Sequence, residues 1–80
     1  MTIETLKKNV FEGNDFYFMF KGVRAGVELT LINRKETYDL WWGDIEKQYH
    51  SFDAVVNDKV FNGMSIKDLL KRNLIVIDYV

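Results

Sequence analysis

The sequence predicts one small α+β domain, an antiparallel sheet with helices packed on one face. Three apolar segments of strand length follow one another with short links, which is typical of an antiparallel meander. Segments with helical spacing of apolar residues lie before and after them. With only 80 residues, the chain can form a single core, and most of its large apolar side chains must lie inside it to offset the entropy of ordering the chain.

A short amphipathic helix is expected over residues 2–11. Thr2 can act as its N-cap, and Gly13 lies just past its end, where glycine favours termination. Glu4, Lys7 and Lys8 lie off the apolar stripe, which is formed by Ile3, Leu6 and Val10.

Three strands are predicted next, at Asp15–Lys21, Val27–Leu31 and Thr37–Trp42. Their links are short, so the strands should pair as an antiparallel meander. Pairing Phe20 with Val27, and Leu31 with Tyr38, places the apolar side chains of all three strands on one face. A slip of one residue would turn one strand's apolar set to the other face, so the pattern favours this register.

The second half contains two short helices and a last strand. The polar segment Gly43–His50 is either a loop or a continuation of the third strand. Ser51 can cap a helix over Phe52–Asn57, and Ser65 with Asp68 resembles a capping box ahead of a second helix. Leu74–Val80 is rich in β-branched residues and predicts a final strand, whose neighbour in the sheet the sequence does not define.

Composition excludes several classes of function. The chain has no Cys, no Pro and one His, His50, so it cannot form disulfides, iron–sulfur clusters or a zinc site of several His and Cys ligands. No cofactor or metal is therefore expected. The net charge is −1 and neither half is strongly basic. No apolar run approaches the length of a membrane span. We expect a cytoplasmic protein that does not enter the membrane.

One segment resembles part of small uncharacterised bacterial proteins, some of them from phages and other mobile elements. It covers about a quarter of the chain and has the pattern F-x-G-x-S-[IL]-x-[DE], carried by Phe61, Gly63, Ser65, Ile66 and Asp68. Met64 stands where such segments often have Lys. The resemblance implies a bacterial or phage origin and a reused turn and helix start. It implies no chemistry.

The second face of the predicted sheet is the candidate functional surface. Trp41 and Trp42 are adjacent, so in a regular strand their rings point to opposite faces, and only Trp42 shares the apolar face of Leu40. The predicted rows on the second face are Met19–Glu28–Trp41 and Tyr17–Thr30–Asp39. A surface of this composition is typical of binding sites for a protein partner or a second copy of the chain. Helices covering this face, or a β-bulge at Trp41, would remove the site. The candidate partner-binding residues are Tyr17, Met19, Glu28, Asp39 and Trp41.

Two other functions are weighed against a non-catalytic binding domain. Nucleic acid could bind through Lys21, Arg24, Arg34 and Lys35, but the acidic Glu28 and Asp39 would repel phosphate. A small enzyme could use His50 with Ser51 and Asp53, but no second base or oxyanion site accompanies them, and Ser51 has a structural role as a helix cap. Both remain alternatives to the binding domain.

Overall fold

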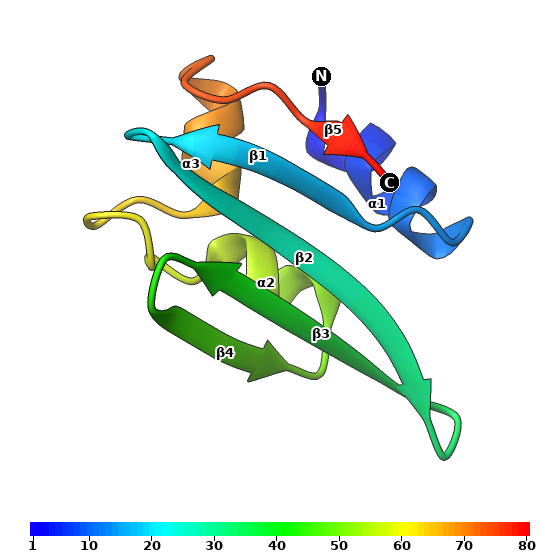
Figure 1. Ribbon diagram of the computed structural model, residues 1–80. Coiled ribbons are helices and arrows are strands. Elements are labelled where there is room, and N and C mark those ends of the chain that lie inside the picture. The colour runs from blue at the N-terminus through cyan, green and yellow to red at the C-terminus, as the bar shows by residue number, and fades with distance from the viewer.

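The computed structural model describes residues 1–80 and contains three helices and a five-stranded antiparallel sheet (Figure 1). The predicted α+β class is confirmed. The strand order is β4-β3-β2-β1-β5, so the first four strands form a meander and the last strand pairs with β1. The elements are α1 (Ile3–Phe11), β1 (Phe16–Phe20), β2 (Val23–Ile32), β3 (Lys35–Trp42), β4 (Ile45–Tyr49), α2 (Phe52–Asn57), α3 (Ile66–Lys71) and β5 (Asp78–Tyr79).

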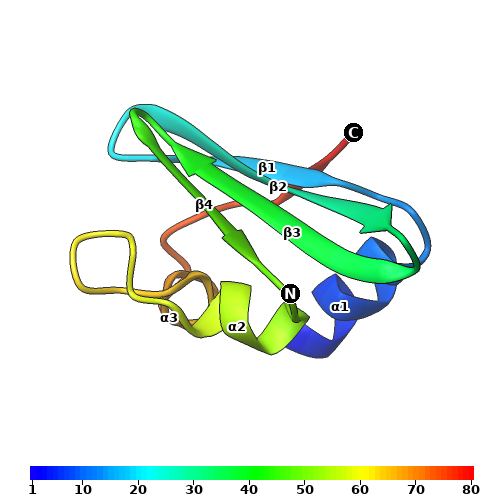
Figure 2. The ribbon, with the colours of Figure 1, turned by 90° about the horizontal axis from the view of Figure 1, so that it is seen from below.

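All three helices pack on one face of the sheet (Figure 2). Between these two layers lies one core of 16 buried residues, to which every helix contributes at least two. No helix covers the opposite face, which we call the open face. By the alternation of side chains along the paired strands, the open face carries Tyr17, Met19, Arg24, Gly26, Glu28, Thr30, Ile32, Lys35, Thr37, Asp39, Trp41, Glu46, Gln48 and Asp78.

Tight turns connect the meander strands. Lys21 and Gly22 form the β1–β2 turn with φ of 52° and 72°, and Asn33 and Arg34 form the β2–β3 turn with φ of 52° and 65°. Positive φ at both central residues is the mark of a type I′ turn, whose twist matches that of the flanking strands. Because each turn uses only two residues, β2 begins at Val23 and includes most of the segment expected to be a link.

The predicted registers are wrong, although the predicted faces are right. Phe20 pairs with Val23 instead of Val27, and Tyr38 pairs with Leu29 instead of Leu31. The partners shift by four and two residues, and an even shift leaves every side chain on its face. The predicted cross-strand rows of the second face are therefore replaced by different ones.

Two further segments differ from the predicted arrangement. Gly43–His50 is neither a loop nor a continuation of the third strand. The chain turns at Gly43, whose φ is 58°, and returns as the separate edge strand β4. The last strand contains only two of the seven residues predicted for it. After α3 the Ile75 side chain packs into the core, and the backbone pairs with β1 only from Asp78 onward.

Side-chain caps fix the starts of the helices as predicted. Thr2 accepts a hydrogen bond from the Thr5 amide, and Ser51 accepts one from the Ala54 amide. At α3, the Ser65 hydroxyl accepts from the Asp68 amide while the Asp68 carboxylate accepts from the Ser65 amide, which completes a capping box. None of the helices is long and apolar enough to span a bilayer.

Candidate functional site

The structure places all five predicted site residues on the open face. Tyr17 and Met19 lie on β1, Glu28 on β2, and Asp39 and Trp41 on β3. Since the helices all pack on the other side of the sheet, the alternative in which they cover this face does not apply (Figure 2). β3 pairs regularly through both of its Trp residues, so no bulge redirects the Trp41 ring.

The two Trp rings point in opposite directions. The Trp42 ring packs against the core, with its centroid 5.1 Å from that of Phe61 and 5.6 Å from that of Phe20. Its Nε1–H group donates a hydrogen bond of 3.3 Å to the Phe20 carbonyl oxygen. Trp42 is therefore a structural residue, whereas Trp41 remains partly exposed on the open face.

Trp41 belongs to a row of residues that crosses all five strands. The register aligns Asp78, Tyr17, Gly26, Trp41 and Glu46. A Cβ atom on Gly26 would lie 2.1 Å from Cζ2 of Trp41, so the indole occupies the space above the glycine. The missing side chain of Gly26 therefore leaves room for the Trp41 ring, which we call the seat of the ring. This role cannot be predicted from the sequence without the cross-strand register.

Three carboxylates lie near Trp41 on the open face, one on each of β2, β3 and β4. Glu46 is the direct cross-strand partner of Trp41, and Asp39 lies two residues before it on the same face. Glu28 is the direct partner of Asp39. The negative charge of Asp39 raises the pKa of Glu46 above its ordinary value. One oxygen of Asp39, Oδ1, is buried and has no hydrogen-bond partner.

A cation–aromatic contact lies on the β1 side of Trp41. The guanidinium carbon of Arg24 lies 4.1 Å from the centroid of the Tyr17 ring. Arg24 pairs across the strands with Met19, whose side chain is 56% exposed. Arg24 belongs to β2 and not to the predicted link between the first two strands, because that link is only the two-residue turn Lys21–Gly22.

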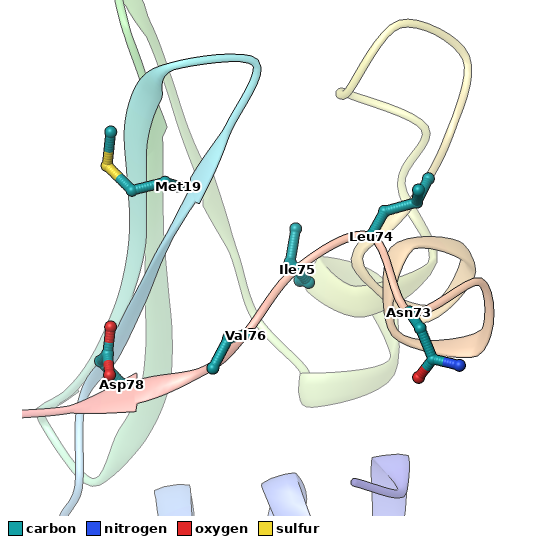
Figure 3. A pocket seen from close by; sticks show the side chains of 6 residues that line it. All are labelled: Met19, Asn73, Leu74, Ile75, Val76 and Asp78. Atoms are coloured by element: carbon teal, nitrogen blue, oxygen red, sulfur yellow. The ribbon is translucent and has the colours of Figure 1, made fainter.

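Met19 also borders a groove at the edge of the sheet. The groove has a volume of about 290 Å³ and is lined by Met19, Asp78 and the segment that leads from α3 to β5 (Figure 3). Within that segment, Val76 is 78% exposed. No backbone hydrogen bond joins the segment to β1 before Asp78. The exposed apolar surface around Met19 therefore extends past the edge of the sheet.

The residues of the two alternative functions are not assembled into sites. Lys21 and Arg24 lie at one end of the ten-residue strand β2, and Arg34 and Lys35 lie at the other end. At ~3.3 Å per residue the two pairs are about 30 Å apart. The Ser51 hydroxyl is engaged with the Ala54 amide at 3.0 Å as a helix cap. His50 instead borders an open hollow beside the β2–β3 turn, lined by Arg34, Lys35 and Glu36.

Comparisons with known protein families, with curated proteins and with solved structures found no match to this chain.

Proposed function

We propose that this protein is a non-catalytic binding domain that holds another protein, or a second copy of itself, against the open face of its sheet. The observation that carries the proposal is the position of Trp41. Its indole extends over Gly26 on the middle strand of the one sheet face that no helix covers. Tyr17 and Met19 border it on β1, and Glu28 and Asp39 supply polar contacts.

The chemistry of these side chains supports a protein partner. Trp, Tyr and Met are enriched in the centres of protein interfaces, where they bury large areas of surface. The seat over Gly26 and the contact with Arg24 already restrict the rings of Trp41 and Tyr17. Binding therefore orders these side chains at a reduced cost in conformational entropy.

The bacterial or phage resemblance of the segment around Phe61 and Gly63 suggests the biological setting. A small accessory protein of a phage or mobile element that binds and inhibits a host protein fits the size of the chain and its open face. This setting makes a protein of the host cell the first partner to look for.

Affinity capture with matched variants tests the proposed function. The wild-type protein, Trp41→Ala and Leu31→Ala are immobilised and exposed to extract of the native cell. Leu31 is the control because it is 68% exposed but belongs to the opposite face of the sheet. We expect a captured protein that Leu31→Ala retains and that Trp41→Ala binds about tenfold or more weakly, as for a central interface Trp.

Two further measurements complete the test. Circular dichroism of Trp41→Ala should show the native spectrum, which separates lost binding from lost structure. Sedimentation velocity of the wild-type protein should show dimers that Trp41→Ala lacks if the partner is a second copy. Equal capture by all three immobilised proteins, with no dimer that depends on Trp41, would refute the function.

A further inference from the structure

We propose that the open face recognises an arginine side chain on a basic segment of its partner, and that the guanidinium lies between the Trp41 indole and the Asp39 and Glu46 carboxylates. The inference rests on the proposed function, since it states the chemistry of the partner that binds there. The charges and the ring each support it, and the planar shape of a guanidinium distinguishes arginine from lysine.

No ion pair within the chain engages the carboxylates of the open face. The two ion pairs of the protein, Lys47–Asp58 and Lys59–Asp68, involve none of its carboxylates. Glu28 and Asp39 are direct cross-strand partners, an arrangement in which like charges destabilise a sheet. A partner that brings positive charge to this position would relieve the repulsion, which gives the charge complementarity on which docking depends.

The ring beside these carboxylates is free to accept a cation. The cation–ring contacts of the protein involve the rings of Phe11, Phe20, Tyr17, Tyr49 and Phe52, and none involves Trp41. Indole is the aromatic side chain that attracts cations most strongly. Arg24 over Tyr17, one strand away, shows a guanidinium in such a contact on the same face.

The carboxylate of Asp39 favours arginine over lysine. Asp39 is only partly buried, and no donor within the chain bonds to its Oδ1 atom. A guanidinium presents several N–H donors in one plane and can stack on a ring while it bonds to a carboxylate. An ammonium group offers a point charge without the planar surface.

Nuclear magnetic resonance with an acetylated hexa-arginine amide tests the proposal. The two Trp residues give two indole N–H signals, which single Trp replacements assign. At low salt, the peptide should shift the Trp41 signal and leave that of Trp42, whose N–H group donates to the Phe20 carbonyl inside the protein. A hexa-lysine amide should bind several-fold more weakly. No shift of the Trp41 signal, or equal affinity for both peptides, would overturn the proposal.

Asp39→Asn is the decisive variant, because its two expected effects have opposite signs. It should weaken hexa-arginine binding at least fivefold and also raise Tm, since it removes like-charge repulsion from Glu28 and Glu46. A purely structural role for Asp39 would lower Tm instead. Glu46→Gln is the second variant and should weaken binding in the same direction. Glu12→Gln, at the end of α1 on the other side of the sheet, is the control and should bind as the wild type does.

Equal affinities of Asp39→Asn, Glu46→Gln and Glu12→Gln would refute the arginine site and indicate diffuse charge attraction. That result would leave the proposed function intact if protein capture still depended on Trp41. The partner would then contact the open face through apolar groups alone. If capture of the protein partner did not depend on Trp41 either, the proposed function would also be refuted.

Discussion

At the scale of single residues, the contact between Trp41 and Gly26 determines the shape of the open face. A glycine inside a strand weakens the strand unless something needs the space that its missing side chain leaves. Here the Trp41 ring fills that space, and the ring in turn covers the exposed backbone of β2. Both residues lie within paired strands, so the contact is held by the sheet and not by a loop.

Gly26→Ala should lower the stability of the protein by about 1–3 kcal/mol, because the new methyl group must displace the Trp41 ring. The backbone itself accepts the change, since Gly26 does not have a positive φ. In a Trp41→Ala background the same change should be neutral or stabilise by up to ~1 kcal/mol, as alanine does over glycine within a strand.

Urea denaturation of the wild type, Gly26→Ala, Trp41→Ala and the double variant measures the coupling between the two positions as a double-mutant cycle. A cost of Gly26→Ala that persisted without the Trp41 ring would show that the ring is not seated on the glycine.

The faces of individual residues could be predicted from the sequence, but their neighbours could not. Alternation alone assigns Trp42 to the core and Trp41 to the open face. The contact of Trp41 with Gly26, and its position beside Glu46, depend on the cross-strand register and on the existence of β4. The apolar pattern does not determine either of these, because even shifts of register bury the same side chains.

At the scale of elements, turn chemistry decides the register that the apolar pattern leaves open. Lys21-Gly22 provides a glycine at the second position of a type I′ turn, which is a recognisable hairpin signal. Asn33-Arg34 is a weaker signal, because Arg34 adopts a φ of 65° that side chains other than Gly, Asn and Asp rarely take. Centring the hairpins on these two pairs would have predicted the observed partners.

Arg34→Gly should stabilise the β2–β3 hairpin by about 0.5–1 kcal/mol. The change removes the steric strain of Arg34 in the left-handed region of backbone conformation. Glycine also gives the unfolded chain more conformational freedom, which offsets part of this gain in stability. Thermal unfolding should show a Tm several degrees higher. Arg34→Ala is the matched control, because it removes the same charge but keeps a Cβ atom and the strain. A Tm equally raised in both variants would attribute the effect to charge.

In the segment before β5, tertiary contacts override the preference of the residues for a strand. Leu74–Ile77 is as rich in β-branched residues as a central strand, yet it pairs with no strand. The Leu74 amide bonds back to the Leu69 carbonyl at the end of α3, and Ile75 then enters the core. The chain crosses from the helical layer to the sheet along this segment. Its apolar residues therefore pack in the core or line the groove at the sheet edge, and its backbone does not pair with a strand.

At the scale of the whole molecule, the charges are divided between regions with different roles. Lys21 and Arg24 lie near one end of β2, and Arg34 and Lys35 lie near the other. Between these two pairs lie the carboxylates of Glu28, Asp39 and Glu46 on the open face. A nucleic acid would meet acidic groups in the middle of the sheet, whereas a basic protein segment would be attracted to them. The carboxylates of the two ion pairs, Asp58 and Asp68, lie near the helices.

Asp58 and Asp68 respond to acid in the opposite way from Glu46. Hydrogen bonds from the Ser65 amide, from Lys59 and from the Ser65 hydroxyl lower the pKa of Asp68 from 3.8 to about 2. Lys47 and Tyr49 likewise lower the pKa of Asp58. Both residues therefore contribute stability above pH ~4 that is lost as the pH falls toward 2. The raised pKa of Glu46 has the reverse effect, so its repulsion destabilises the fold at neutral pH and is relieved as Glu46 is protonated.

The free energy of unfolding, measured by urea denaturation from pH 7 to pH 2, should therefore fall most steeply below pH ~4. Asp68→Asn should be less stable than the wild type at pH 7 and should lose less on acidification, because its missing carboxylate no longer titrates. Glu46→Gln should be more stable than the wild type at pH 7, and this difference should shrink as the pH falls through and below the raised pKa of Glu46. The same acid response in all three proteins would show that neither carboxylate contributes in the way the structure indicates.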